Sequence, residues 1–295
     1  MTADSASAGI GISSGRGRRI LGFVRRRPAT VVAGLCVILL ICTAVFAAWL
    51  APHDPYAQDL LHRLQPPDAR HLLGTDDYGR DVLSRIIFGA RISLIASLQA
   101  VALALILGLP LGIIAGYRGG WVNTLFTRMM DALMSAPSLV LAITIVAVLG
   151  SGITNAMVAV GLVMAPRFFR VARASTMDVR GETYIEATVA LGATPARTII
   201  RHILPNVMPP IILVISVSLG TAVAAEASLS FLGLGAEAPA ASWGSMLSTA
   251  ASNMQLAPHL VWPPGVMIFL TVLAFTYLGD GARRALTRSG NGSEK

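Results

Sequence analysis

Residues 186–205 read EATVALGATPARTIIRHILP, a stretch with helical spacing, broken by glycine and proline, that lies between two long apolar runs. The residues from 184 to 191 favour a helix, and Gly192 follows them where a left-handed residue ends one. Thr194 and Pro195 then supply an N-cap and a first-turn proline, which start a second helix. The pattern predicts a helix, a break at Gly192 and another helix.

The second helix of this stretch is basic. Arg197 and Arg201 stand four residues apart and share one face, and Pro205 is expected to interrupt the helix before the next apolar run. A helical elbow of this kind is suited to docking against a partner. An ordinary basic loop between two membrane spans explains the same residues equally well, so the residues alone leave both interpretations open.

The composition places this stretch in a membrane protein. Of 295 residues, 54% are hydrophobic and only 13% are charged, about half the charged share of an ordinary soluble domain. A span needs roughly 20 apolar residues. Six segments reach or nearly reach this length: 31–50, 94–115, 133–149, 153–169, 207–232 and 260–278. The third and fourth are short, and we expect them to form a tight hairpin around GSGITN. We therefore expect an all-α membrane protein with six transmembrane helices.

The basic residues predict how the chain is oriented. Eighteen of the 23 lie on one side of the six spans when both termini share that side. Because Lys and Arg accumulate in cytoplasmic connections, the N- and C-termini are expected to be cytoplasmic. The net charge of +8 then follows from topology, so we expect no nucleic-acid partner. Residues 16–27 are basic enough to contact anionic membrane lipid.

The predicted topology divides the chain into a basic cytoplasmic tail, an anchor helix, an extracytoplasmic loop, a five-helix core with a cytoplasmic loop at 170–206, and a cytoplasmic tail. The boundaries of these five parts are 1–30, 31–50, 51–93, 94–280 and 281–295. The extracytoplasmic loop is expected to end in an amphipathic helix at the membrane surface, capped by Thr75, Asp76 or Asp77. Its polar side carries Arg80, Asp81, Ser84, Arg85 and Arg91.

Small residues mark the second span as a packing surface. Gly108, Gly112, Ala115 and Gly116 recur at helical spacing and would let another helix approach closely.

The opening stretch resembles the cytoplasmic "EAA" loop of binding-protein-dependent ABC importer permeases. The positions that match this loop are Glu186, Ala187, Gly192, Leu204 and Pro205. Thr188 departs from it, and His202 gives RHILPN, a form similar to that of the dipeptide, oligopeptide and nickel branch. Segments 73–94, 225–235 and 242–247 are similar to the second, C-type permease subunit of those systems.

This resemblance implies a type I importer permease fold in a bacterial cytoplasmic membrane and a set of partners. They are a homologous second permease subunit, two ATPase subunits and an extracytoplasmic solute-binding protein. The transported solute would be a short peptide, with nickel or another small solute as the alternative. The residues expected to couple the chain to the ATPase are Glu186, Ala187, Gly192, Thr194, Pro195, Arg197, Leu204 and Pro205.

Hydrolysis of ATP is expected on the partners, with ATP and Mg bound there and no cofactor on this chain. A P-loop needs a lysine at the phosphates, and the only lysine is Lys295. An ion-coupled secondary transporter is an alternative of another class, but it needs a charge relay within the spans and usually an internal repeat. Neither is evident, nor is a motif that would indicate a membrane peptidase.

Two sets of ionisable residues have open roles. Glu226, with Ser228 and Ser230 close by, lies near the outer end of the fifth span, where it either binds a peptide's ammonium group or pairs with an arginine of the helix at 80–91. We favour the structural pair. His53, His62 and His71 lie nine residues apart and lack the short ligand spacing of zinc sites, so we predict no metal site.

Overall fold

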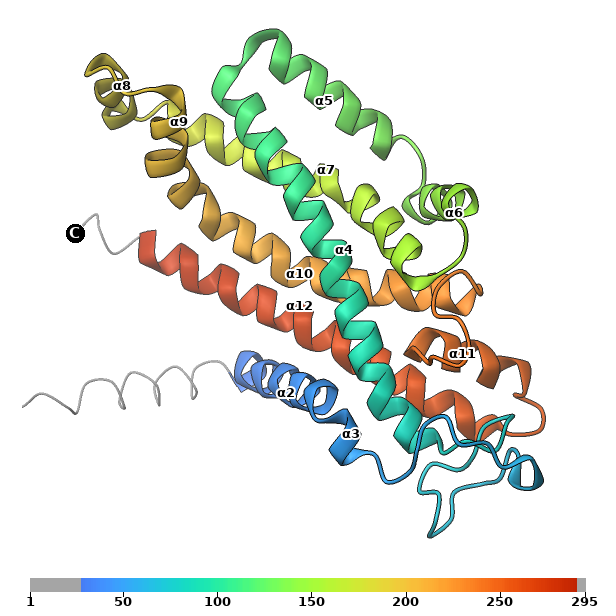
Figure 1. Ribbon diagram of the computed structural model, residues 1–295. Coiled ribbons are helices and arrows are strands. Elements are labelled where there is room, and N and C mark those ends of the chain that lie inside the picture. Colours follow the sequence, from blue (N-terminus) through green and yellow to red (C-terminus); the bar gives the residue numbers. More distant parts are fainter. Residues whose placement is uncertain (1–27, 291–295) are drawn as a thin grey trace, which may run out of the picture.

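The computed structural model describes residues 28–290 (Figure 1). The predicted lipid-contacting segment 16–27, most of the tail at 1–30, and residues 291–295 lie outside the described residues. Within them the secondary structure is helical, apart from one isolated bridge between Thr75 and Asp81. The all-α prediction is therefore confirmed.

Long helices make up the bundle. Within residues 28–290, five helices are long and apolar enough to cross a membrane, and a bent pair adds a sixth when counted as one span. The single spans are α2 (Pro28–Val45), α4 (Val82–Arg118), α7 (Ile153–Arg180), α9 to α10 (Pro195–Phe231) and α12 (Trp262–Gly290). Shorter elements are α3 (Ala47–Leu50), η1 (Leu60–His62), α8 (Thr183–Ala190), α11 (Trp243–Ser252) and η3 (Pro258–Val261).

The third span differs from the prediction of one helix over 133–149. The chain forms α5 (Gly120–Met134) and α6 (Ser138–Leu149), which meet at an angle of 91°. The break falls just before α6, where Pro137 lacks a backbone N–H and disfavours helical geometry in the residue before it. The predicted hairpin between the third and fourth spans is present, because α6 turns at Gly150–Gly152 and packs on α7.

The closest helix pair of the bundle is α4 with α7, and glycines make it possible. A methyl group added at Gly112 would lie 2.6 Å from the carbonyl oxygen of Phe169 and 2.7 Å from Cβ of Ala172. Methyl groups added at Gly108 and Gly116 would lie equally close to backbone oxygens of α7, at 2.5 and 2.7 Å. The predicted role of these small residues is confirmed, since only glycine lets the two backbones approach this far.

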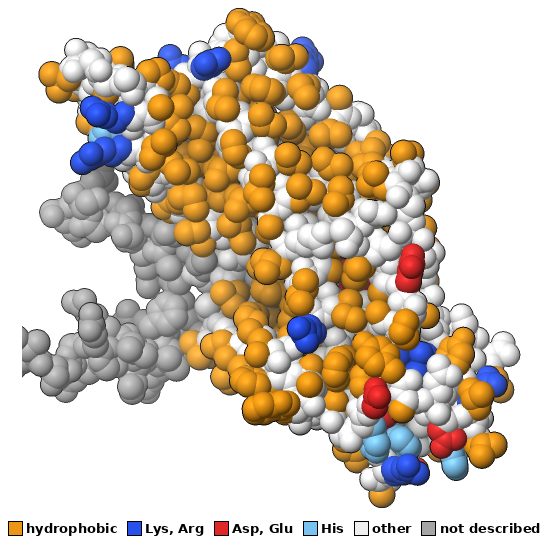
Figure 2. All heavy atoms as spheres, viewed as in Figure 1, with side chains coloured by type: hydrophobic (Ala, Val, Ile, Leu, Met, Phe, Trp, Pro, Cys, Tyr) orange, Lys and Arg blue, Asp and Glu red, His pale blue; other side chains and the backbone are white. Residues whose placement is uncertain are grey.

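The bundle has two polar ends and an apolar flank. At one end α8 and α9 project beyond the bundle, and at the other lie the loop of residues 51–81 and α11 (Figure 1). We call these the elbow end and the loop end. Hydrophobic side chains cover much of the flank between them, while charged side chains gather towards the ends (Figure 2). This distribution fits a membrane around the flank.

The amphipathic surface helix predicted at the loop end is not a separate element. The first turns of α4 occupy it, and α4 runs on without a break to Arg118. Most of its polar side does not face solvent, because Ser84 and Arg85 are buried under the loop and only Arg91 of the predicted set is exposed. Trp243 of α11 packs across these turns and donates from Nε1 to the carbonyl oxygen of Ile86, 3.0 Å away. Tertiary packing therefore covers a face that the sequence pattern alone assigns to water.

Candidate functional site

The elbow, residues 183–205, is built from two helices and a sharp turn. After α8, Gly192 donates to the carbonyl oxygen of Val189 at 2.9 Å, and Ala193 donates to that of Thr188 at 3.3 Å. This pair of bonds is a Schellman motif, which requires a left-handed residue, and Gly192 has a φ of +84°. The predicted break at Gly192 is confirmed.

The second helix begins as predicted and does not end as predicted. The hydroxyl oxygen of Thr194 accepts a hydrogen bond from the N–H of Arg197, and Pro195 occupies the first turn of α9. Pro205 does not interrupt the chain, because a π-helical segment, η2 (Ile199–Ile203), joins α9 to α10 (Leu204–Phe231). The wider π turn places Pro205 in the first turn of α10, where its missing N–H costs little.

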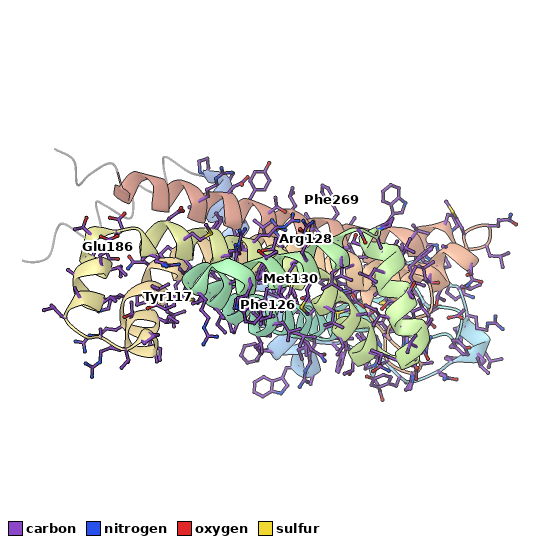
Figure 3. All side chains as sticks on the ribbon, turned by 90° about the horizontal axis from the view of Figure 1, so that it is seen from above. Tyr117, Phe126, Arg128, Met130, Glu186 and Phe269 are labelled. Atoms are coloured by element: carbon purple, nitrogen blue, oxygen red, sulfur yellow. The ribbon has the colours of Figure 1, made fainter. Side chains whose placement is uncertain are left out.

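The elbow presents a mixed apolar and basic surface. Leu191 is 90% exposed and Ile200 is 66% exposed, while the side chains of Glu186, Arg197 and Arg201 are also exposed. Of α8 itself, only Ile185 is buried. Glu186 lies at the far elbow end of the bundle (Figure 3). Exposed large aliphatic side chains at a polar end of the molecule are typical of a contact surface.

Tyr184 links the two helices of the elbow and the start of α10. Asn206 donates to the hydroxyl oxygen of Tyr184 at 3.2 Å, and the rings of Tyr184 and His202 meet edge to face at 6.4 Å. Beside the elbow, a cavity of about 310 Å³ lies between the elbow-end turns of α4 and α7 and is lined in part by Glu186 and Arg180. The elbow is thus an ordered projection with a recess next to it.

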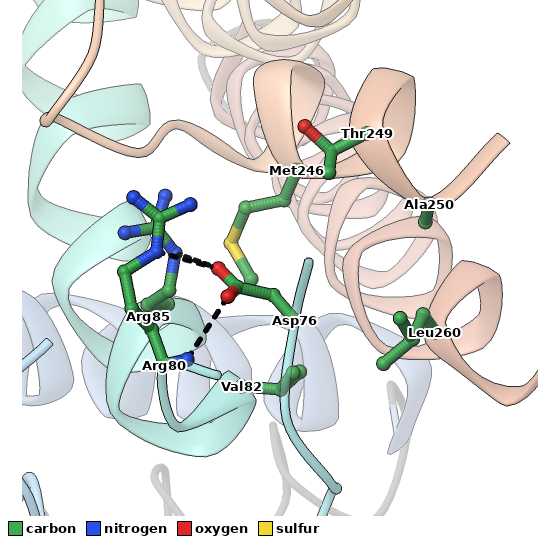
Figure 4. A pocket seen from close by; sticks show the side chains of 8 residues that line it. All are labelled: Asp76, Arg80, Val82, Arg85, Met246, Thr249, Ala250 and Leu260. Atoms are coloured by element: carbon green, nitrogen blue, oxygen red, sulfur yellow. Dashed lines mark hydrogen bonds and ion pairs between the residues drawn. The ribbon is translucent and has the colours of Figure 1, made fainter. Parts of the chain in front are cut away.

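The loop end contains a buried ion-pair cluster (Figure 4). Asp76 Oδ2 lies 2.7 Å from Nε of Arg80 and 3.2 Å from Nε of Arg85. Arg85 also donates from Nη1 to the carbonyl oxygen of Pro55 at 3.2 Å. Both arginines therefore share the carboxylate of Asp76, and Arg85 also binds the loop to α4. Arg91, one of the same predicted set, is exposed.

Asp81, and not Thr75, Asp76 or Asp77, caps α4. Its Oδ2 accepts hydrogen bonds from the N–H of Ser84 at 2.8 Å and from the Ser84 hydroxyl at 2.7 Å. Asp76 instead closes the preceding turn by accepting from the N–H groups of Tyr78 and Arg80. The bends imposed by Gly74 and Gly79, both with positive φ, place Asp76 too early to reach the helix.

Two of the three histidines meet at Asp81. His71 Nδ1 lies 2.9 Å from Asp81 Oδ1, and His53 Nδ1 lies 3.7 Å from Oδ2. One ligand atom from each of the three residues fits within a 4.8 Å group, which the nine-residue spacing did not predict. The carboxylate is already used by Ser84 and His71, so the cluster is accounted for as a support of the helix cap. His62 pairs with Asp59 instead.

Glu226 does not pair with an arginine among the described residues. Its side chain is 1% exposed, and Oε1 accepts a hydrogen bond of 2.6 Å from the hydroxyl of Ser230, one turn later. Oε2 is buried without a hydrogen-bond partner. The favoured pairing with an arginine of the helix at 80–91 is therefore wrong. The buried Arg80 and Arg85 both form ion pairs with Asp76 instead. Ser228 points elsewhere and donates to the carbonyl oxygen of Ala224.

Comparison with known families covers most of the chain. Residues 108–289 match the family "binding-protein-dependent transport system inner membrane component", and residues 18–67 match "N-terminal TM domain of oligopeptide transport permease C". The chain belongs to this family of ABC importer permeases. The resemblance seen in the elbow sequence is thus confirmed, and the permease is of the peptide and oligopeptide branch.

Individual relatives agree over nearly the full length. The permease is 44% identical over 262 residues to the glutathione transport system permease protein GsiD of Pectobacterium atrosepticum, covering 88% of this chain and 87% of that one. The GsiD protein of Escherichia coli O6:K15:H31 is also 44% identical, over 265 residues. These relatives are permease subunits, so the chain is a multi-pass inner-membrane transport subunit and not an enzyme.

A solved structure supports the fold. The inward-facing methionine ABC transporter MetNI matches with a TM-score of 0.57 at 21% identity, over 69% of this chain and 95% of that one. A second crystal form of MetNI gives a TM-score of 0.55. The permease therefore has the type I ABC importer permease fold.

One residue of the permease that sequence reasoning missed is Arg167. It falls near the end of the predicted fourth span at 153–169, but α7 continues to Arg180 and leaves Arg167 at the middle of the helix. There it lines a cavity of about 410 Å³ between α6, α7 and α10. A charged residue within an apolar segment was the available signal.

The Asp81 cap predicts how acid acts on the loop end. Burial acts to raise the pKa of Asp81, but hydrogen bonds from Ser84 and His71 outweigh it, so the pKa lies below its ordinary value of 3.8. A lowered pKa in the folded state stabilises the fold above the ordinary value, and this stability is lost as the pH falls through the lowered pKa. We expect Asp81→Ala to lower the free energy of unfolding by about 1–2 kcal/mol near neutral pH.

The deficit of Asp81→Ala against the unsubstituted permease is expected to shrink below the ordinary pKa of 3.8, as measured by thermal unfolding in detergent at a series of pH values. Burial and the neighbouring Asp76 raise the pKa of Asp77, which acts in the opposite direction, but this effect is common to both proteins and cancels in the comparison. Asp54→Ala, at an exposed acid of the same loop, is the control. A deficit that is independent of pH would contradict the prediction.

Proposed function

We propose that this permease is one half of the transmembrane part of an ATP-driven importer of short peptides. It pairs with a homologous permease subunit, rests on two ATPase subunits that bind ATP and Mg, and receives its solute from an extracytoplasmic binding protein. Both termini and the elbow face the cytoplasm, as the distribution of basic residues favours. The loop end then faces the binding protein.

The ordered, projecting elbow is the observation that carries this proposal. Its exposed Leu191 and Ile200 need an apolar partner surface, and Arg197 and Arg201 beside them suit acidic groups at the rim of a groove. An ion-coupled transporter has no use for such a projection. ATP-driven closure of two ATPase subunits would carry the two elbows, and the helices attached to them, through a rigid-body movement.

The glutathione permeases that resemble this chain support a peptide as solute. Glutathione is itself a small peptide, and 44% identity over 88% of the chain extends through the helices that surround the 410 Å³ cavity. The cavity is lined mostly by apolar side chains, with a few hydroxyl groups and the guanidinium of Arg167, as suits a site for a small solute.

Co-purification tests the assembly directly. The permease is expressed with the products of the neighbouring genes, and the ATPase rate is measured in lipid with the binding protein, empty or loaded with peptides. We expect a stable complex whose ATPase rate rises severalfold only with the loaded binding protein. A permease that purifies alone and moves solute down an ion gradient would overturn the proposal, and stimulation by nickel alone would replace the peptide.

A further inference from the structure

Arg167 places a positive charge within the membrane-spanning part of the permease. It lies 14 residues after Ile153, the first residue of α7, which is about 21 Å along a helix of 28 residues. The hydrocarbon core of a membrane is about 30 Å thick, so an α7 that enters it at Ile153 carries Arg167 well inside it. Charged residues at this depth face a partner, a water-filled cavity or a solute path.

No partner for the Arg167 guanidinium exists within the described part of the chain. The neighbouring arginines of the same helix are both engaged: Arg170 pairs with Asp131 at 2.9 Å, and Arg173 donates to the side-chain oxygen of Asn123. Arg167 has no hydrogen bond and no ion pair to a described residue, and its side chain is exposed. The three arginines stand three residues apart, and only Arg167 is left without an acceptor.

The cavity that Arg167 lines has no other charge. Its walls come from α6, α7 and α10 and are apolar except for Arg167 and three hydroxyl residues, Ser138, Thr221 and Ser228. Thr221 donates its hydroxyl hydrogen to the carbonyl oxygen of Ser218, and Ser228 donates to that of Ala224. These two hydroxyl hydrogens are therefore used within α10. The guanidinium is the strongest free donor that a solute would meet there.

We propose that Arg167 binds the carboxylate of the transported peptide as it passes through this cavity. A planar guanidinium presents paired N–H donors that match a carboxylate, and the surrounding walls offer no competing charge. The same charge repels a divalent metal cation. The proposal rests on the proposed importer function and narrows it, since it makes the solute a carboxylate-bearing peptide and disfavours nickel.

Transport by the complete complex in lipid vesicles tests this role. Uptake of a tripeptide with a free C-terminal carboxylate is compared with uptake of its C-terminal amide, for the unsubstituted complex and for complexes with Arg167→Gln, Arg167→Lys or Arg167→Glu. We expect Arg167→Gln to raise the KM for the free acid about tenfold and to change uptake of the amide less than twofold. Arg167→Lys should retain most of the uptake, and Arg167→Glu should abolish uptake of the free acid.

Arg128→Gln is the matched control. Arg128 is an exposed arginine on α5, is labelled in Figure 3, and does not line the cavity, so its replacement should leave both KM values unchanged. Assembly and the basal ATPase rate of every variant are measured in parallel. Assembly should not change, because Arg167 has no hydrogen bond or ion pair to another described residue; the basal ATPase rate should be unchanged only for Arg128→Gln.

Two outcomes would overturn the role of Arg167 while leaving the importer intact. In one, Arg167→Glu takes up the free acid as well as the unsubstituted complex does. In the other, Arg167→Gln lowers uptake of the free acid and of the amide equally, or weakens assembly. Arg167 would then bind an acidic residue of the partner permease or a lipid phosphate, and not the peptide. A complex that takes up no peptide before any substitution would instead be a failure of the proposed function.

Discussion

Gly192→Pro is expected to abolish solute uptake, by at least about tenfold, and to reduce co-purification of the ATPase subunits. Proline holds φ near −65°, whereas Gly192 has a φ of +84°, so the turn cannot form with proline in place. The substitution also removes the N–H that donates to the carbonyl oxygen of Val189 at 2.9 Å. Without the Schellman motif, α8 and α9 lose their relative orientation, and the elbow surface is no longer presented.

The control for this prediction is Gly181→Ala in the connection before the elbow. Gly181 has a φ of −75°, and an added methyl group would lie no closer than 3.6 Å to any neighbouring atom, so alanine fits without strain. Membrane insertion and thermal unfolding of both variants are measured with uptake, since the bundle does not depend on Gly192. Normal uptake and normal ATPase binding by the Gly192→Pro complex would refute the coupling role of the elbow.

Gly112→Ile is expected to destabilise the bundle itself, by about 3 kcal/mol. The first added carbon atom already falls 2.6 Å from a backbone oxygen and 2.7 Å from a Cβ atom of α7, so no rotamer relieves the clash. The two helices must separate, which would disrupt packing along their whole contact. Unfolding of the purified permease in mixed detergent, followed by loss of helical circular dichroism, measures the change.

Gly34→Ala provides the comparison, because α2 offers open space at that position within 4 Å. Alanine there should change the free energy of unfolding by less than about 1 kcal/mol, and in the stabilising direction, since glycine is the poorer helix former. An unaltered stability of Gly112→Ile would mean that α4 and α7 are not in the close contact described above.

The local structure of the elbow was largely predictable from sequence. Gly192, Thr194 and Pro195 act through their own backbone and neighbouring N–H groups, and such short-range preferences are readable without the rest of the fold. Family membership was also predictable, because several matching segments occur in the same order along the chain. The functional coupling of these residues to an ATPase stays a prediction.

Features that depend on distant segments were not predictable. The buried state of Arg85 requires the loop at Pro55, thirty residues earlier, and the environment of Arg167 requires α6 and α10. The predicted helix break at Pro205 was wrong because the effect of a proline depends on the geometry of the preceding turn. The π turn before Pro205 lets the helix continue. The break in the third span was not predicted because mean hydropathy is averaged over residues on both sides of Pro137. It carries no information on the angle between the two helices.

The π turn also has a mechanical consequence. Because η2 joins the elbow to α10, residues 195–231 form one continuous helical run of about 55 Å that extends from the elbow to Thr221 and Ser228 beside the cavity. Tilting such a rod by about 10° around its middle displaces each tip by about 5 Å, close to the pitch of one helical turn. In the proposed importer, a small displacement of the elbow by an ATPase subunit would move the far end of this helix by a similar distance.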